Sequence, residues 1–252
     1  MDRLIREDNV RLGKTYTFEY DNNGNILNKN TYQFTNAIDP ISSQGPYDHT
    51  ESSYGYTDTG NRDRLLVLND EHFDYDALGN PATYRNKSLT WDNLRDLVQY
   101  GDMRFSYDAS GSRQSKSLEG SSHFTTTETK YHWAGSQLLA ETRTSAYEDL
   151  ELNDPLTNDP AYANASIINI SYIQGANGLT GFIVSGSGNS GDRTYYYRKN
   201  IHGDVTHIFD HNGNIAAEYV YDAWGNHTII TDIVGIDESV MAYISHLKDF
   251  SS

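Results

Sequence analysis

Several short runs of the chain combine residue types that bind ligands in other proteins. GSGNSG at 186–191 satisfies the Gly-x-Gly-x-x-Gly pattern of dinucleotide-binding loops. That pattern works only when a helix follows at once, because the N-terminus of the helix holds the pyrophosphate. Here it is followed by DRTYYYRKN at 192–200, which is typical of a strand. We therefore expect a flexible hairpin tip at this position and no bound cofactor.

Histidines and turn aspartates are residue types that can bind metal ions. His202, His207 and His211 are close in sequence, but their spacing does not place them on one strand face. Zinc requires three or four convergent ligands. Asp210 opens the run DHNGN, whose Gly is at the fourth position rather than the sixth position of an EF-hand loop. We expect no metal site, and we expect turn aspartates to accept hydrogen bonds from the backbone.

The sequence evidence for a catalytic site is equally weak. No Gly-x-Ser-x-Gly run is present, and the absence of cysteine excludes thiol catalysis, disulfides and cysteine-based zinc sites. The chain has 35 Asp and Glu residues, so accidental carboxylate pairs are certain, and no pair is singled out for glycosidase chemistry. We expect no catalytic residue, and the chain is predicted not to be an enzyme.

Three consecutive aromatic residues, Tyr195, Tyr196 and Tyr197, are the candidate ligand-stacking group. Tyrosines on a sheet can stack on sugar rings. Alternatively, tyrosine fills a half-buried sheet face and its hydroxyl group reaches water. Because successive strand residues point to opposite faces, at least one of the three must point away from its neighbours.

One phrase recurs along the chain and indicates the elements that position these residues. It combines alternating aromatic residues with Asp-x-x-Gly and a final Asn or Ser. The copies are FEYDNNGN at 18–25, FDYDALGN at 73–80, FSYDASGS at 105–112, IFDHNGN at 208–214 and YVYDAWGN at 219–226.

Each copy of the phrase predicts a β-hairpin. The alternating aromatic residues point to one face of a strand, Asp accepts backbone N–H groups in the turn, and Gly adopts positive φ. Asp76, Asp92 and Asp108 follow one another at 16-residue intervals, which fits two strands and two turns. The predicted structural turn residues are Asp21, Gly24, Asp76, Gly79, Asp108, Gly111, Asp210, Gly213, Asp222 and Gly225.

Composition agrees with an all-β chain. There are 20 Tyr and 20 Gly but only 5 Pro among 252 residues, which favours strands and turns. The formal net charge of −16 disfavours a nucleic-acid partner. No apolar run is long enough to span a membrane, and the first residues, MDRLIREDNV, do not read as a signal peptide.

The repeated Tyr-Asp-x-x-Gly-Asn phrase resembles the YD repeat of the Rhs family, which bacterial Tc toxins and animal teneurins share. LTWDNLRDLVQYGDMRFSYDASGSRQSKS and YYYRKNIHGDVTHIFDHNGNIAAEYVYDAWGN resemble the Rhs repeat-associated region. The resemblance implies a long β-ribbon that forms a shell around a C-terminal toxic domain. The Arg-Tyr-rich segment and the self-cleavage site of the family have no counterpart here, so self-cleavage is not expected.

We therefore predict hairpins that form a curled antiparallel sheet or half-shell. The ribbon covers 1–230 with an insertion loop at about 145–165, and a divergent tail covers 231–252. In the tail, apolar spacing predicts a short helix over about 237–248. The strand at 227–236 is nearly uncharged, so we expect the helix to cover this edge, or two chains to pair there.

The predicted function is a non-enzymatic structural segment of an Rhs-type polymorphic toxin or wall-associated protein. Its implied partners are the remainder of a larger shell and the enclosed toxin domain, and its implied location is secreted or at the cell surface. The alternative function is a cell-surface carbohydrate-binding module that uses exposed Tyr and Trp side chains, which a glycan array would distinguish.

Overall fold

The protein is described by a computed structural model. The described residues are 3–40, 49–56, 62–118, 126–146, 166–176, 178–186 and 191–232. The secondary-structure elements of these ranges are β-strands that pair antiparallel with their neighbours, which confirms the predicted all-β class. The predicted helix at about 237–248 and most of the predicted insertion loop lie outside the described residues.

The first sheet has six strands in sequence order. They are β1 (Arg6–Asn9), β2 (Lys14–Tyr20), β3 (Ile26–Gln33), β4 (His49–Tyr56), β5 (Leu65–Leu68) and β6 (Glu71–His72). Each strand pairs with the next one along the chain, as expected for consecutive hairpins.

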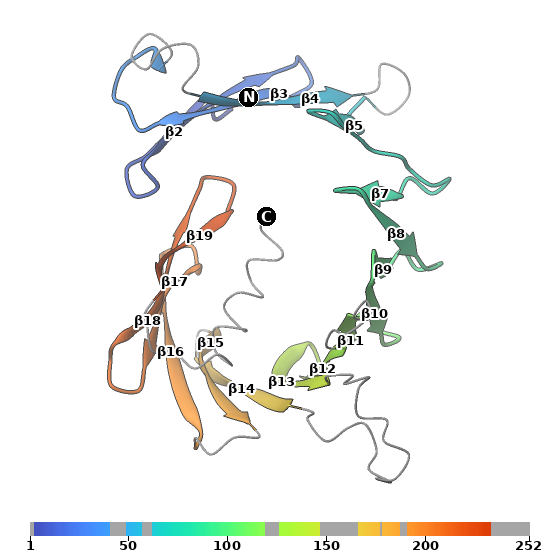
Figure 1. Ribbon diagram of the computed structural model, residues 1–252, viewed down its shortest axis with the longest axis vertical. Coiled ribbons are helices and arrows are strands. Elements are labelled where there is room, and N and C mark those ends of the chain that lie inside the picture. Colours follow the sequence, from blue (N-terminus) through green and yellow to red (C-terminus); the bar gives the residue numbers. More distant parts are fainter. Residues whose placement is uncertain are drawn as a thin grey trace, which may run out of the picture. The chain divides into compact units, whose positions relative to one another are not determined.

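The second sheet has thirteen strands, again in sequence order. They are β7 (Thr83–Tyr84), β8 (Lys87–Trp91), β9 (Leu97–Tyr100), β10 (Met103–Tyr107), β11 (Arg113–Leu118), β12 (Thr126–Ala134), β13 (Gln137–Ala146), β14 (Ser166–Gly175), β15 (Gly178–Gly186), β16 (Arg193–Lys199), β17 (Val205–Asp210), β18 (Ile215–Tyr221) and β19 (His227–Asp232). Within each sheet the colours of Figure 1 pass from one strand to its neighbour in chain order.

The hydrogen-bond ladder is interrupted between β6 and β7, so the hairpins form two sheets rather than one. In this part of the chain an isolated bridge joins Tyr75 to Pro81. On either side of this bridge the N–H of Asp76 donates to the carbonyl of Asn80 at 2.9 Å and the N–H of Ala82 donates to the carbonyl of Asp74 at 2.7 Å, so the hairpin around Asp76 keeps its turn and a short ladder. The sequence phrase alone does not reveal the interruption between β6 and β7, because the turn residues are intact.

The chain forms two compact units. One comprises residues 1–88 together with 220–228, and the other comprises 89–219 together with 229–252. The first unit thus includes a short segment that contains the turn of the last repeat. In the described ranges, no helix is long and apolar enough to cross a membrane.

The first aromatic residue of the repeated phrase is buried in each unit. Phe18 and Phe73 are 4% and 7% exposed in the first unit, and Phe105 is 7% exposed in the second. The core of the second unit also contains Phe182 and Ile170, which are 0% and 1% exposed. These residues alternate with more exposed neighbours, as the two-residue period of a strand requires.

Candidate functional site

The Asp76 turn shows the geometry of the repeated phrase. The N–H of Gly79 donates to the carbonyl oxygen of Asp76 at 3.0 Å, and the N–H of Asp76 donates to the carbonyl of Asn80 at 2.9 Å. Gly79 has a φ of +85°, in the left-handed region that glycine adopts without steric cost. These features define a three-residue hairpin loop: a type I turn closed by a glycine bulge.

The carboxylate of Asp76 binds the backbone of its own loop. One oxygen, Oδ1, accepts from the N–H groups of Leu78 at 2.9 Å and Asn80 at 2.8 Å. The other, Oδ2, accepts from the side-chain amide of Asn80 at 2.9 Å. The side-chain amide of Asn80, followed by backbone donors, holds the pKa of Asp76 below its ordinary value. The carboxylate is thus stabilised as an anion that organises the turn.

The same arrangement recurs in the other repeats. Asp21, Asp210 and Asp222 accept hydrogen bonds from Asn25, Asn214 and Asn226 at 2.8–2.9 Å. The predicted turn glycines all have positive φ: Gly24 at +103°, Gly111 at +81°, Gly213 at +84° and Gly225 at +83°, in addition to Gly79.

In the Asp108 turn, serine replaces the final asparagine. The side chain of Ser110 donates to Oδ1 of Asp108 at 2.6 Å, and Gln114 donates to Oδ2 at 2.9 Å. The pKa of Asp108 is lowered, chiefly by the hydrogen bond from Ser110. Gln114, two positions after Ser112, therefore supplies the side-chain amide that Asn supplies in the other turns.

Two further turns of this class were missed or only half recognised in the sequence. At 200–204 asparagine takes the first position of the turn and aspartate the last. Asn200 accepts from the N–H groups of His202 and Asp204, and its side-chain amide donates to Asp204 at 2.8 Å. At 92–96 the residue in the glycine position is Arg95, at a φ of +68°. Both turns carry Asp or Asn at two positions four residues apart, which is the sequence signal that identifies them.

Tyrosine hydroxyl groups form a second repeated contact. Tyr20 donates to the carbonyl of Leu4 at 2.7 Å, and Tyr75 donates to the carbonyl of Leu65 at 2.6 Å. Tyr107 donates to the carbonyl of Leu97 at 3.0 Å. Each of these three hydroxyl groups thus satisfies a backbone acceptor nearby.

An arginine accompanies each of these tyrosines. The guanidinium carbons of Arg3, Arg64 and Arg113 lie 5.5, 4.8 and 5.5 Å from the ring centres of Tyr20, Tyr75 and Tyr107. A positive group over an aromatic face is attracted to its electrons. The sequence carried a signal for the first two: Asp-Arg-Leu at 2–4 and again at 63–65.

The three consecutive tyrosines do not form one surface. Tyr195 is 5% exposed and stacks on Phe182, with ring centres 5.0 Å apart. The ring of Tyr197 lies 5.5 Å from that of Phe182, on the same face. Tyr196 is 48% exposed. The alternation of β16 thus places Tyr195 and Tyr197 against the core and leaves Tyr196 as the accessible ring of the three.

The histidines and the Gly-x-Gly-x-x-Gly run are the remaining candidates for ligand binding. His207 is buried beside Phe209, with ring centres 5.7 Å apart, whereas His202 and His211 lie in turns and are exposed. In the described ranges, no group of three or more His, Asp or Glu residues is placed to hold a metal ion. The Gly-x-Gly-x-x-Gly run is followed by strand β16, not by a helix.

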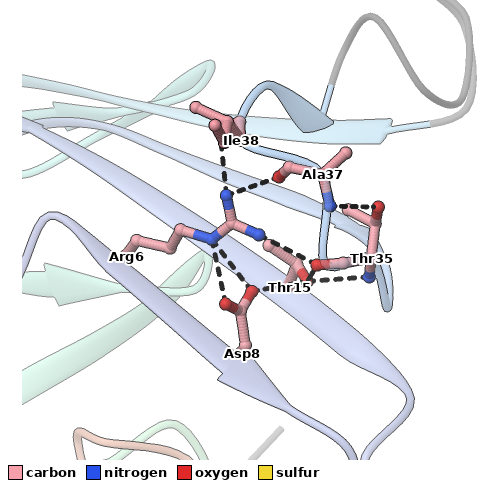
Figure 2. Close-up of polar contacts among 6 residues, drawn as sticks. All are labelled: Arg6, Asp8, Thr15, Thr35, Ala37 and Ile38. Atoms are coloured by element: carbon pink, nitrogen blue, oxygen red, sulfur yellow. Dashed lines mark hydrogen bonds and ion pairs between the residues drawn. The ribbon is translucent and has the colours of Figure 1, made fainter.

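A polar cluster on the first hairpin, which the sequence did not reveal, is shown in Figure 2. Nε of Arg6 donates to the carboxylate of Asp8 at 2.9 Å. Its terminal nitrogens donate to the carbonyl groups of Thr35 at 2.9 Å, Ala37 at 2.7 Å and Ile38 at 3.1 Å. One guanidinium group therefore fixes the segment that follows β3 against β1.

Thr15 completes this cluster beneath Arg6. Its side chain is 0% exposed, and Oγ1 donates to Asp8 at 2.9 Å. The same oxygen accepts from the N–H of Thr35 at 3.1 Å. Because buried polar groups are costly without partners, this pattern indicates a structural cluster whose polar atoms satisfy one another.

The second unit contains a buried carboxylate. Glu141 is 7% exposed; it accepts from the hydroxyl group of Tyr172 at 2.6 Å and pairs with Arg143 at 3.3 Å. Burial, and then the negative charge of Glu141, raises the pKa of Tyr131 above its ordinary value. Since these residues come from β12, β13 and β14, the cluster joins three adjacent strands.

Comparison with known proteins finds relatives by sequence. No family model matches the chain. It is 30% identical over 172 residues to the tRNA3(Ser)-specific nuclease WapA of Bacillus spizizenii, and 28% identical over 172 residues to the tRNA(Glu)-specific nuclease WapA of Bacillus subtilis subsp. natto. Each match covers 66% of this chain, and the chain spans only 6% of the length of these relatives.

Comparison of structures identifies the fold. The crystal structure of TcdB2-TccC3 without its hypervariable C-terminal region matches 87% of this chain with a TM-score of 0.64 and 16% identity. The match covers 10% of that much longer chain. At this identity the likeness shows a shared architecture of consecutive antiparallel hairpins.

Proposed function

We propose that the chain is a non-enzymatic structural segment of an Rhs-type YD-repeat protein, in which its hairpins enclose or present a C-terminal effector domain. The observation that carries the proposal is the repeated turn itself. In each repeat the conspicuous carboxylate accepts hydrogen bonds from its own loop, as Asp76 does at 2.8–2.9 Å. Such carboxylates maintain a ribbon of hairpins.

The sequence relatives support a scaffold role. Two nucleases whose names give different tRNA targets match this chain over the same length, 172 residues, at 30% and 28% identity. A segment that chooses or cleaves the RNA would be expected to differ between them. The shared segment is better explained as a part that both proteins need regardless of their target.

The structural neighbour supports the same role. The matched TcdB2-TccC3 structure lacks its hypervariable C-terminal region, so the likeness lies outside that region. By analogy, the partners of this segment are the remainder of a larger shell and an enclosed toxin domain. The proposed location is secreted or at the cell surface, as part of a longer protein.

The proposal is tested first by assaying the purified full chain against total bacterial tRNA, with and without divalent cations. We expect intact tRNA, with a known tRNA nuclease as the positive control. Cleavage by the chain that is lost in Glu141→Gln, the variant of a buried carboxylate paired with Arg143, would contradict a purely structural role.

The shell role is tested in the gene that encodes the chain. We expect the coding sequence downstream to encode a toxin domain or an immunity protein. Unrelated housekeeping genes on both sides would argue against this role.

Exposed aromatic side chains support the carbohydrate-binding alternative. Tyr196 and Trp224 are 48% and 51% exposed. A glycan array on the full chain distinguishes the two functions. Binding that is lost in Tyr196→Ala and retained in Leu78→Ala, a control at another exposed side chain, would favour the alternative; we expect no glycan signal.

A further inference from the structure

One face of the first hairpin contacts the turn of the last repeat. Glu7 and Tyr16 are paired across β1 and β2, and Phe18 is paired with Lys29 across β2 and β3, so these side chains share a face. Together with Asn9 they form what we term the docking face. The segment 220–228, which belongs to the same compact unit, lies against it.

The docking face binds the backbone on both sides of Asp222. Oε2 of Glu7 accepts from the N–H of Ala223 at 3.0 Å. The side-chain amide of Asn9 donates to the carbonyl of Tyr221 at 3.1 Å. The side chain of Asn9 also donates to Glu7 at 3.0 Å, which orients the two contact residues together. Two backbone groups that flank one aspartate are thus bound at the same time.

Side chains add an aromatic and an ionic contact. The ring of Trp224 meets that of Phe18 edge to face, with centres 5.7 Å apart and planes at 66°. Nζ of Lys29 lies 3.7 Å from Oδ2 of Asp222 and 4.8 Å from the ring centre of Tyr16. The side chains of Lys29 and Asp222 are 22% and 6% exposed, so this pair is less screened by water than a surface pair.

We propose that the docking face is a recognition site for a tryptophan-bearing Asp-x-x-Gly-Asn turn, and that Trp224 makes the site select the turn of the last repeat. The turns share the backbone geometry, and all except the Asn200 turn share the aspartate, so these features cannot select the last repeat. The residues at the position of Trp224 in the other turns are Asn23, Leu78, Leu94, Ser110, His202 and Asn212. None of these has an indole ring to cover Phe18.

The closest competitor is the Asp76 turn. YDAWGN and YDALGN differ only by Trp224 in place of Leu78. An edge-to-face aromatic pair adds stabilisation beyond the area that it buries, whereas leucine supplies burial alone. The preference of the docking face therefore depends on one side chain, Trp224, whether or not the whole protein is a shell.

Hydrogen exchange at the Ala223 amide reports the docking directly, because this N–H donates to Glu7 across the contact. Ala77 has the same position in the Asp76 turn and serves as the internal control. By NMR on the full chain, we expect Ala223 to exchange more slowly than Ala77. We expect Trp224→Leu to speed exchange at Ala223 by about threefold to tenfold and to leave Ala77 unchanged.

Two outcomes of this experiment overturn the proposal. One is equal exchange of Ala223 and Ala77 in the unmodified chain. The other is a Trp224→Leu variant in which the rate at Ala223 does not change. A fold-wide loss of structure is recognised separately, because the amide of Phe182 in the core of the second unit would then also lose protection.

A cross-linking experiment identifies which copy of the turn docks. The chain has no cysteine, so Glu7→Cys and Ala223→Cys can be introduced together and bridged with a short bis-maleimide. We expect a cross-linked monomer whose yield is independent of dilution, whereas the pair Glu7→Cys with Ala77→Cys gives a lower yield. A covalent dimer as the main product would overturn docking within one chain.

Discussion

One side chain, an aspartate or its amide equivalent, organises each turn of the repeated class described above. In the Asp76 turn a single carboxylate oxygen accepts two backbone N–H groups, and the second oxygen accepts the amide of Asn80. At Asn200 an amide oxygen accepts the same two backbone groups, and Asp204 supplies the second partner. The requirement is therefore an acceptor at the first position and a complementary partner four residues later.

This equivalence predicts unequal effects of substitutions at Asp76. Asp76→Asn retains the acceptor for Leu78 and Asn80 and should lower the melting temperature only slightly at neutral pH. Asp76→Ala removes every side-chain acceptor and should lower it clearly more. Thermal unfolding followed by circular dichroism measures both variants. Equal melting temperatures for Asp76→Ala and the unmodified chain would contradict the assigned role.

The difference in stability between these variants depends on pH. The pKa of Asp76 is lowered in the folded state, so the carboxylate contributes stability above its unfolded pKa. This contribution is lost as the pH falls through the folded pKa. The difference in stability between the unmodified chain and Asp76→Ala should therefore shrink in acid, and a difference that grows would have the wrong sign.

Gly213 allows a test of backbone conformation without steric interference. Its φ is +84°, and a Cβ built there would meet no atom within 4 Å. Gly213→Ala should destabilise the chain by about 1–2 kcal/mol through left-handed strain alone. Gly213→Asn should cost less because asparagine tolerates that region. Urea unfolding measures both, and a larger cost for Asn than for Ala would contradict the explanation.

The turn residues could be read from the sequence because their interactions are local. Asp, Gly and Asn interact within five consecutive residues, so spacing alone reveals them. The contact of Tyr75 with the carbonyl of Leu65 could not be read in this way, because it depends on strand pairing across a hairpin. The alternation of Tyr195 and Tyr196 was predictable, but which ring is buried depends on packing against Phe182.

At the scale of elements, the first hairpin is covered on both faces. An isolated two-stranded hairpin is marginally stable in water. On one face, Arg6 and Thr15 hold the segment after β3, and on the other face Phe18 and Lys29 contact the turn of 220–228. The short strands β1 and β2 therefore gain their stability from segments that lie outside the hairpin.

Arg6 is predicted to be essential for holding the segment after β3 against the first hairpin. Arg6→Lys keeps the charge but cannot reach Asp8 and three carbonyl groups together, since an ammonium group lacks the planar fork of guanidinium. We expect a loss of about 1–3 kcal/mol, from hydrogen bonds to a charged group. Faster chymotrypsin cleavage after Phe34 would show the loosened segment.

The control for Arg6 is Arg104→Lys, an exposed arginine on β10. It should leave cleavage after Phe34 unchanged. If both variants were cleaved equally fast, the effect would reflect general destabilisation instead of a local contact of Arg6.

The antiparallel hairpins were predictable at this scale, but the division into two sheets was not. The Asp76 turn and the hydrogen bonds beside it are intact, so the phrase FDYDALGN gives no sign that β6 and β7 belong to separate sheets. The buried position of Glu141 was also not predictable, since its partners Tyr172 and Arg143 lie on other strands or further along its own. Long-range pairing determines both features.

For the whole molecule, sequence order and spatial order coincide within each sheet, and neighbouring hairpins stabilise one another. The contact of Glu7 with Ala223 differs from these neighbouring contacts because it joins two segments that are 216 residues apart in the sequence. The entropic cost of closing so long a loop grows only logarithmically with its length. A few well-oriented contacts on the docking face can therefore hold the two segments together.

The tyrosine content gives the molecule a distinctive response to alkali. Burial raises the pKa of Tyr16, Tyr54, Tyr56, Tyr75 and Tyr131 above the ordinary value of about 10. Their neutral forms are favoured in the folded state, so their contribution to stability is complete below the unfolded pKa. It is lost as the pH rises through the higher folded values.

We therefore expect the folded chain to ionise its tyrosines later than the unfolded chain. Titration followed by absorbance at 295 nm should show part of the signal delayed above pH 10 and released together as the sheets unfold. The same chain in concentrated urea, where burial is removed, should titrate as one group near 10. The variant Tyr131→Phe should remove part of the delayed signal. Superimposable curves for the folded and urea-unfolded chains would show that burial of these rings does not control the response.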